Sequence, residues 1–283
     1  MASGIDWKQT DRNLIRLLSQ ELRPIHYTEA FNRTKVWSCA SYNEKTDPVE
    51  KFRQRFGEGD GEPGFDFIRG GFIALSRWFP LRHSLSLLPP QEQVIIEGNT
   101  IVSFDAGYET AKREPHMQNK FNKSPQAWYE RRRRGMLVES HIANYFRINY
   151  PRFFIEPSNK GQYENPAKED FTLKTDWTTI AVDIKSLGED NDETFVVTRP
   201  CADVSIYIIG DLLEDKNQTI ITGFTTTDIV KVLGEKQSQV NDAWIVNTRD
   251  TWSIEPLLVM LNMADCGMNY NEYKRQRKVK MLA

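Results

Sequence analysis

The chain has 283 residues, of which 39% are hydrophobic and 11% aromatic, so it can bury one large core or two ordinary ones, and disorder throughout is excluded. Its formal net charge is −2, so any binding to nucleic acid would depend on local positive charge. Three widely separated cysteines, and the lack of an apolar leader or an 18-residue apolar segment, predict a cytoplasmic protein with reduced thiols, no zinc site and no membrane span.

Three helices are predicted near the N-terminus. A stripe of leucines at helical spacing ends before Pro24, and a second helix is expected near Thr28, whose hydroxyl can cap it. In the third helix Asp47 is the expected N-cap, Pro48 the first residue and Gly57 the stop. The leucines of the first stripe are Leu14, Leu17, Leu18 and Leu22.

Two short strands around Gly70 and Gly71 follow in "FDFIRGGFIALSRWFP", and three helices followed by a hairpin are the order of a winged helix-turn-helix. The stretch resembles the HARE-HTH winged-helix domain in Trp7, in Arg23–Glu29 ("RPIHYTE") and in Phe67–Trp78 ("FIRGGFIALSRW"). The resemblance covers the first 80 residues or so and implies binding to duplex DNA, with sensitivity to modified bases.

The third predicted helix carries the candidate DNA contacts Lys51, Arg53, Gln54 and Arg55, and the hairpin adds Arg69. Such a helix would enter a major groove, where arginine can bond guanine and glutamine can bond adenine. The alternative is a winged helix that contacts another protein through a charged surface. Residues 1–104 are expected to form this domain, with a further short hairpin at 81–104, and the polar stretch 105–127 is expected to be a linker.

A long helix is predicted in "PQAWYERRRRGMLVESHIANYF", which opens the second domain, residues 128–283. Glu139 lies on its apolar face, where a carboxylate is costly unless it is paired or binds something. The arginine run 131–134 in this helix and the basic run 274–280 near the C-terminus are expected to be a solvated helix face and a solvated tail. Strands and helices then alternate, which predicts an α/β or α+β domain.

The stretch "DFTLKTDWTTIAVDIKS" predicts a hairpin that turns at Thr175–Thr178. Asp170 then lies opposite Asp183, and Lys185 lies on the same face. Two close carboxylates and the carbonyl of Ile184 form an oxygen site suited to Mg²⁺. The lysine can position a water and stabilise charge on a phosphate, and Glu139 can reach the same cluster from its helix.

Glu139, Asp170 and Asp183-x-Lys185 match the arrangement of PD-(D/E)xK nucleases, which residues 128–262 resemble also in the order helix, hairpin, further strand. The run Gly135–Glu139 and the segment "IITGFTTTDIV" are similar to that superfamily as well. Glu169 stands where the pattern has proline, which leaves Glu169 and Asp176 as competing ligands. The structural alternative is a surface hairpin with a salt bridge between Asp183 and Lys185.

The two resemblances together imply a Mg²⁺-dependent, sequence-specific double-stranded DNA endonuclease similar to type II restriction enzymes. The expected catalytic residues are Asp170, Asp183, Lys185 and Glu139, and the expected metal ligands are Asp170, Asp183, Ile184 and Glu139, at two sites that Mn²⁺ can also fill. A double-strand break by such sites suggests a homodimer. A repair or structure-specific nuclease and a non-catalytic DNA-binding regulator are the alternatives.

The expected fold class is α/β (α+β), with an N-terminal winged helix-turn-helix and a C-terminal restriction-endonuclease-like mixed sheet flanked by helices.

Overall fold

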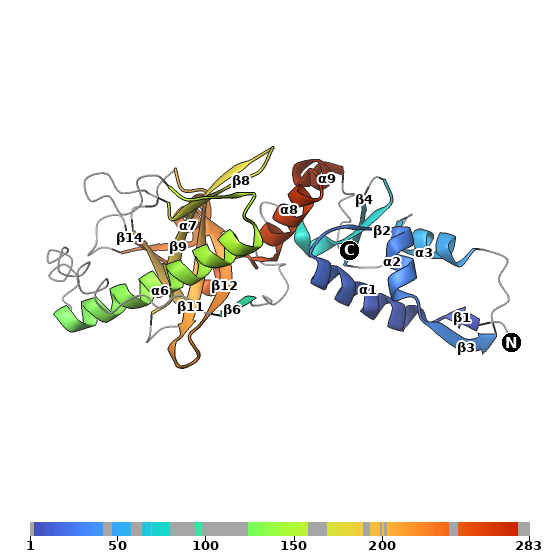
Figure 1. The fold of residues 1–283 in the computed structure, drawn as a ribbon, viewed down its shortest axis with the longest axis horizontal. Helices are drawn as coiled ribbons and strands as arrows, with labels where there is room; N and C mark the ends of the chain where they lie inside the picture. Colours follow the sequence, from blue (N-terminus) through green and yellow to red (C-terminus); the bar gives the residue numbers. More distant parts are fainter. Residues whose placement is uncertain are drawn as a thin grey trace. The chain divides into compact units, whose positions relative to one another are not determined.

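A computed structural model describes residues 3–41, 47–57, 64–68, 70–79, 94–97, 124–157, 169–188, 193–198, 200, 203–237 and 243–276. The fold is mixed α+β, in agreement with the expected class (Figure 1). The chain divides into two compact units, unit 1 with residues 1–84 and 255–283, and unit 2 with residues 85–254. None of the helices in the described ranges has the length and apolar character needed to cross a bilayer.

Unit 1 combines helices from both ends of the chain with short antiparallel strands. Its helices are α1 (Trp7–Glu21), α2 (Tyr27–Thr34), α3 (Pro48–Gly57), α8 (Glu255–Asp265) and α9 (Tyr270–Gln276). Its strands are β1 (Ser3–Ile5), β2 (Ile25–His26), β3 (Trp37–Ser41), β4 (Phe65–Ile68) and β5 (Phe72–Leu75). β1 pairs with β3, and β2, β5 and β4 form a sheet in that order. The three predicted helices and the predicted hairpin are present, whereas β1, β2 and β3 were not predicted.

The start of α3 and the turn of the β4–β5 hairpin form as the sequence predicts. Asp47 caps α3, because its carboxylate accepts a hydrogen bond of 2.9 Å from the N–H of Val49. Gly70 and Gly71 have φ angles of +92° and +87°, which favour glycine at the turn. The cap of α2 differs from the prediction: His26 occupies the N-cap position and its ring accepts from the N–H of Thr28.

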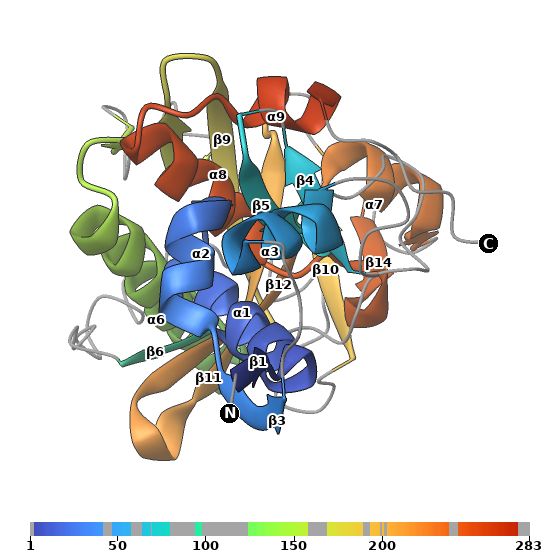
Figure 2. The ribbon, with the colours of Figure 1, turned by 90° about the vertical axis from the view of Figure 1, so that its right-hand side faces the viewer.

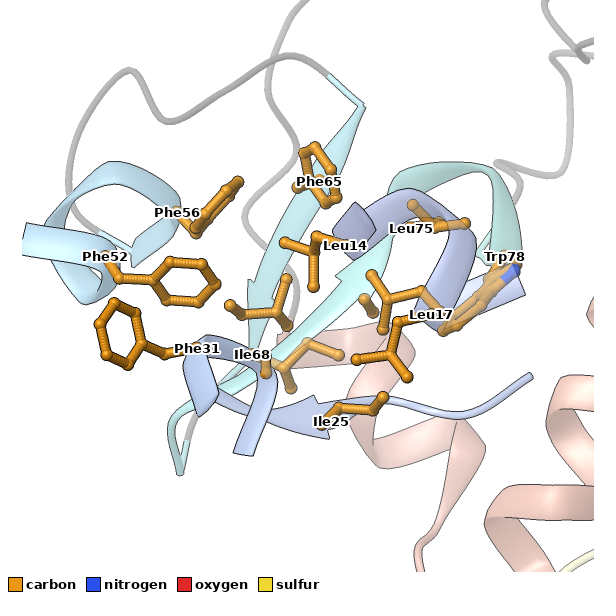
Figure 3. Close-up of a cluster of buried hydrophobic side chains, with 14 of the residues drawn as sticks. Leu14, Leu17, Ile25, Phe31, Phe52, Phe56, Phe65, Ile68, Leu75 and Trp78 are labelled. Atoms are coloured by element: carbon orange, nitrogen blue, oxygen red, sulfur yellow. The ribbon is translucent and has the colours of Figure 1, made fainter. Parts of the chain in front are cut away.

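The core of unit 1 is rich in phenylalanine and leucine (Figure 3). The ring of Phe52 lies 5.5 Å from that of Phe31 and 4.8 Å from that of Phe56, so α3 is packed against α2. Val259 and Met263 of α8 are fully buried in the same cluster. The C-terminal helix α8 is therefore part of the core that the N-terminal segments build.

Polar contacts also fix the C-terminal helices in unit 1. Arg77 donates two hydrogen bonds to the carboxylate of Glu255, at 2.7 and 2.9 Å, and a third of 3.0 Å to the hydroxyl of Ser19. The side chain of Asn262 donates to the carbonyl of Leu22 over 3.3 Å. This arrangement differs from the expected domain 128–283, because an apolar helical period predicts a buried face but does not identify the element that covers it.

Unit 2 is built around a six-stranded mixed sheet. Its helices are α6 (Pro125–Asn149) and α7 (Thr227–Leu233). Its strands are β6 (Val94–Glu97), β7 (Phe154–Ile155), β8 (Phe171–Lys174), β9 (Thr179–Ser186), β10 (Thr194–Thr198), β11 (Ile206–Leu213), β12 (Gln218–Thr226), β13 (Glu235–Lys236) and β14 (Ala243–Asn247). The large sheet has the order β6-β12-β11-β9-β8-β7, and β10, β14 and β13 form a smaller sheet. β9 and β11 are parallel, whereas the other neighbours in the large sheet are antiparallel.

The two faces of the large sheet are covered differently (Figure 2). Helix α6 packs closely on one face, since a Cβ added to Gly210 of β11 would lie 2.5 Å from Val138 and 2.9 Å from Ile142. On the other face, Tyr207 and Ile209 of β11 share a buried cluster with Val230 of α7 and with residues of β10 and β14. Val138, Ile142 and their neighbours on α6 are buried, as the predicted apolar stripe requires.

Two further differences concern the expected N-terminal domain and linker. Strand β6 pairs with β12 and so belongs to unit 2, although residues 81–104 were assigned to the N-terminal domain. The expected linker 105–127 lies outside the described residues as far as 123. At Ser124 the chain begins α6, because the serine hydroxyl accepts from the N–H of Ala127.

Candidate active site

The β8–β9 hairpin has the predicted register. Phe171 pairs with Val182, and the strands are joined by the predicted turn at Thr175–Thr178. The regular pairing stops at Phe171 and Val182, and Asp170 comes just before Phe171. Asp170 and Asp183 are nevertheless close, because the charge of Asp183 raises the pKa of Asp170.

The regular pairing of β8 with β9 ends at Phe171, and Asp170 is the residue just before it. The N–H of Asp170 donates to the carbonyl of Val182 over 2.8 Å, and its Oδ2 accepts from the N–H of Ile184 over 2.7 Å. The Asp170 carboxylate thus occupies the place that a main-chain carbonyl has in a continued strand. The carbonyl of Ile184 points to the same side of β9 as its N–H, because both groups of a strand residue face one neighbour. The carboxylate of Asp170 and the carbonyl of Ile184 therefore lie on the same side of β9.

Asp183 and Lys185 form an ion pair on one face of β9. The Nζ of Lys185 donates to Oδ1 of Asp183 over 2.6 Å, and the side chains are 25% and 19% exposed, so both can be reached from solvent. The lysine ammonium also lies 5.8 Å from the centre of the Tyr207 ring. Tyr207 is directly beside Asp183 in the parallel pairing of β9 and β11, and it is almost fully buried. The tyrosine ring therefore supports the ion pair from the side of β11.

Glu139 approaches this site from α6. The side chain is partly buried, and it follows Val138, which is fully buried against the sheet. Its negative charge raises the pKa of both Asp170 and Asp183, so the three carboxylates are close enough to repel one another. The structure thus brings together all four residues that the sequence analysis assigned to catalysis.

Burial and like charge raise the pKa of both aspartates. The pKa of Asp170 is raised from 3.8 to about 8, first by burial and then by the charges of Glu139 and Asp183. The hydrogen bond from Ile184 and the charge of Lys185 oppose this rise. Burial also raises the pKa of Asp183, although Lys185 acts against it. With its three carboxylates ionised, the site would carry more negative charge than one lysine balances.

This excess of negative charge fits a divalent cation. In the described part of the chain, no group of three or more histidine, cysteine, aspartate or glutamate side chains is arranged to hold a metal by itself. The oxygen donors that converge are the carboxylates of Asp170 and Asp183 and the carbonyl of Ile184. Mg²⁺ in proteins commonly keeps several waters and takes only one or two carboxylates, so this small donor set suits it.

The two competing carboxylates occupy different places. Asp176 lies in the turn at the closed end of the hairpin, seven residues from Asp183, which corresponds to roughly 20 Å along a strand. Glu169 is next to Asp170, but it is not among the groups that shift the pKa of either aspartate. Of the alternatives that the sequence leaves open, Asp170 is the one whose pKa is raised by the charge of Asp183.

The candidate DNA contacts of α3 differ in how they are held. Arg55 makes a two-pronged salt bridge with Asp11 of α1, and its guanidinium lies 5.3 Å from the ring centre of Trp7. Arg53 pairs with Glu50 at 3.5 Å on the same helix, whereas Gln54 is exposed. Lys51 is partly buried, and Arg69 lies outside the described residues. Arg55 therefore joins α3 to α1 in this structure.

The arginine run of α6 is held in the same way. Arg133 donates to Glu130 over 2.9 Å and to Glu214 over 2.8 Å, and Arg134 donates to Glu214 over 3.2 Å. Glu214 begins the turn between β11 and β12. These arginines thus attach α6 to that turn, whereas the sequence analysis expected a solvated face.

Tyr207 is a site residue that was not predicted. The signal was present, because "SIYIIG" places one aromatic polar side chain in an otherwise aliphatic strand. Which strand lies beside β9 is a matter of sheet order, and the sequence alone does not give that order.

Comparisons of the chain with protein-family models, with curated proteins and with solved structures found no match. The function must therefore be inferred from the placement and chemistry of the side chains.

Proposed function

We propose that the protein is a Mg²⁺-dependent endonuclease that hydrolyses phosphodiester bonds of double-stranded DNA. The observation that carries this proposal is the meeting of Asp170, Asp183 and Lys185 at the open end of the β8–β9 hairpin. A structural salt bridge between Asp183 and Lys185 does not account for Asp170, whose carboxylate adds a second negative charge at the same place. A site that binds a cation accounts for all three side chains.

In this proposal Asp170, Asp183 and the carbonyl of Ile184 hold the cation, and Glu139 bonds its waters. Mg²⁺ bound at these oxygens would lower the pKa of a coordinated water and neutralise charge on the phosphate. Asp170 would bind the cation as its carboxylate, so binding would release the carboxyl proton to solvent. Lys185 uses one N–H for Asp183, and its two others can orient a water and a phosphate oxygen.

We propose that unit 1 is the DNA reader, a winged helix-turn-helix in which α3 enters the major groove. Support comes from the order α1, β2, α2, β3, α3, β4, β5 and from the pairing of β2 with β5 beside the hairpin. Gln54 is the exposed candidate for reading a base on α3. Sequence-specific cleavage like that of type II restriction enzymes, sensitivity to base modification and a homodimer that cuts both strands complete the proposal.

The test is cleavage of plasmid and linear duplex DNA by the purified protein with Mg²⁺, Mn²⁺ or EDTA. We expect cutting with either metal and none with EDTA. Asp183→Asn and Lys185→Ala should lower the rate by about 100-fold or more, since the first removes a ligand of the cation and the second removes a positive charge beside the phosphate. Asp176→Asn, the same change at the closed end of the hairpin, is the matched control and should cut like the unaltered protein.

Wild-type activity in Asp183→Asn would exclude this active site. Sequencing of the cut ends then separates the related functions: a fixed sequence at the ends indicates a restriction-type enzyme, and ends that follow DNA structure indicate a repair nuclease. Binding without any metal-dependent cleavage would instead support the non-catalytic regulator.

A further inference from the structure

The N-terminal helix α1 buries one face and exposes three basic side chains on another. Leu14 and Leu17 belong to the buried core of unit 1 (Figure 3). Lys8, Arg12 and Arg16 are all exposed, and they follow one another at intervals of four residues. Residues at this spacing are neighbours on the surface of a helix. The three basic residues therefore form a line along α1, and we call them the α1 stripe.

The α1 stripe differs from the other basic side chains of unit 1 in having no carboxylate beside it. Carboxylates hold the other described arginines of this unit, namely Arg23, Arg33, Arg53, Arg55 and Arg77. By contrast, no side chain of the α1 stripe makes a hydrogen bond or an ion pair with another described residue. The acidic residues of α1 itself are engaged elsewhere, Asp11 by Arg55 and Glu21 by Arg33. The positive charge of the stripe is thus not balanced within the described part of unit 1.

The stability of the helix does not explain the α1 stripe. Like charges four residues apart repel each other and weaken a helix slightly, and the stripe contains two such pairs. A cation in the first turn is also unfavourable, because the helix macrodipole places positive charge there. Lys8 lies in the first turn of α1, which carries no acidic residue, although the preceding Asp6 caps the helix. The arrangement is therefore better suited to an anion that lies along the helix.

The α1 stripe begins beside the helix that is proposed to read DNA. Arg55 of α3 reaches Asp11, which lies one turn after Lys8 on α1. The ring of Trp7, the first residue of α1, is stacked on that of Phe52 of α3, with 6.5 Å between their centres. These contacts hold the two helices together, so the stripe keeps a defined position relative to α3.

We propose that the α1 stripe binds successive phosphates of duplex DNA. The proposal rests on the proposed function in one respect, the binding of duplex DNA by unit 1. The stripe spans about 12 Å, at roughly 1.5 Å per helical residue. Phosphates of one strand follow one another at roughly 3.4 Å along the duplex axis, so a strand that crosses the stripe offers a phosphate to each side chain. Such contacts fix the register and orientation of a protein on DNA without reading its sequence.

The surroundings of the stripe favour DNA over an anionic membrane surface. A helix that lies on a membrane buries a broad apolar face among the lipids. The leucines of α1 are already packed in the core of unit 1, and Ile15 is the one exposed large hydrophobic residue in the described part of this unit. The basic residues are therefore better suited to phosphates that are reached from water.

The experiment measures binding of a labelled random duplex to the full chain, in EDTA, at several salt concentrations. Near 0.1 M salt, Lys8→Gln/Arg12→Gln/Arg16→Gln should weaken binding roughly fivefold to tenfold for each phosphate contact that is lost. The slope of log affinity against log salt should become shallower by about 0.9 for each contact, or about 2.7 for three. Lys8→Arg/Arg12→Lys/Arg16→Lys keeps the three charges and should retain the slope.

Folding of the variants is checked by thermal melting. Glutamine is a good helix former, and its introduction removes the repulsion within the stripe, so the melting temperature should not fall. Arg12→Gln alone makes the same test with one contact, and it should make the slope shallower by about 0.9. An unchanged slope in this single variant and in the triple variant would overturn the inference.

A second control removes three charges elsewhere. Lys216→Gln/Lys231→Gln/Arg249→Gln alters exposed residues of unit 2 and should leave the salt slope unchanged. An equal loss of slope in this variant would overturn the inference, because the effect would then follow from net charge alone. Loss of affinity for phosphatidylserine vesicles with unchanged DNA binding in the α1 variants would also overturn it, in favour of a membrane.

Cleavage assays keep this inference apart from the proposed function. Mg²⁺-dependent cleavage by the triple glutamine variant, at protein concentrations that saturate the DNA, should match that of the unaltered protein. If the salt slope does not depend on the stripe and cleavage persists, the inference fails and the proposed function stands. If the slope depends on the stripe in a protein that never cuts DNA, the inference stands and the nuclease is excluded.

Discussion

The carboxylate of Asp170 accepts a hydrogen bond of 2.7 Å from the main-chain N–H of Ile184, at the point where β8 stops pairing with β9. The side chain of Asp170 thereby takes the place of a main-chain acceptor on β8, and the regular strand pairing does not continue past this end of the hairpin. Both the carboxylate and the neighbouring carbonyl of Ile184 are presented at this opening. Changes to the carboxylates around it should therefore act on metal binding before they act on the fold.

Asp170→Asn should abolish metal-dependent cleavage and leave DNA binding intact, because the amide keeps the shape of the side chain but is a poor ligand for Mg²⁺. The adjacent Glu169→Gln is the matched control, since the sequence offered Glu169 as a competing ligand. Cleavage rates for the two variants decide between them. If Glu169→Gln is inactive and Asp170→Asn cuts normally, the ligand has been assigned to the wrong residue.

Glu139→Gln should stabilise the metal-free protein and slow its cleavage. The carboxylate of Glu139 raises the pKa of both aspartates, so removing its charge relieves repulsion among the three groups. Thermal melting in EDTA at pH 8 and cleavage rates in Mg²⁺ measure the two effects. A more stable variant with undiminished activity would show that Glu139 plays no part in the chemistry.

The metal-free protein should lose stability as the pH rises from about 4 to about 8. Asp170 has a pKa of about 8 when folded and an ordinary value of 3.8, so in this range the folded chain holds a proton that the unfolded chain has released. The free energy of unfolding therefore falls with rising pH. Mg²⁺ at pH 8 should restore stability, because it binds the folded carboxylates.

Melting curves at pH 5, 6.5 and 8, in EDTA and in Mg²⁺, test this linkage. Asp170→Asn supplies the control, since its loss of stability between pH 5 and 8 should be smaller than that of the unaltered protein. An identical pH dependence in both proteins would contradict the assignment of this proton to Asp170.

Arg55→Ala should lower stability more than it lowers sequence preference. Its guanidinium holds Asp11 and lies over the ring of Trp7, so truncation removes a tie between α3 and α1. Gln54→Ala should instead leave stability unchanged and relax preference at one base pair, by roughly 1–3 kcal/mol. Melting temperatures and binding to duplexes with single base changes separate the two roles. If Arg55→Ala instead loses sequence preference at unchanged stability, Arg55 is a DNA contact.

Glu255→Ala should destabilise unit 1 and leave the stability of unit 2 unchanged. The change removes the carboxylate that holds the partly buried guanidinium of Arg77, which costs about 3 kcal/mol when one member of a buried pair is removed. Hydrogen exchange should become faster in α1 and α8 and stay unchanged in β9 and β11. Glu272→Ala, an exposed glutamate of α9, is the control and should leave exchange in α1 unchanged.

Local features were predicted well from the sequence because their causes are local. The turn residues of the β8–β9 hairpin fix its register, so the sequence alone predicts that Phe171 lies beside Val182 and that Asp170 comes near Asp183. Asp47 and Pro48 likewise mark the start of α3.

Features that depend on partners far along the chain were not predicted. The sequence could not show that Val259 of α8 is buried in the same cluster as Leu14 rather than against the large sheet. In the same way, the sequence alone predicts that Arg55 contacts DNA, whereas in the structure Arg55 pairs with Asp11. Burial and charge pairing between distant segments are properties of the assembled core.

The burial of Val259 and Met263 in unit 1 has a consequence for synthesis of the chain. A ribosome releases residues in order, and domains commonly fold from the N-terminus as they emerge. Here the residues of unit 2 are all present before α8 is made, whereas the core begun by α1 has to wait for it. Unit 2, which is proposed to cut DNA, is thus able to fold before unit 1, which is proposed to choose the cleavage site.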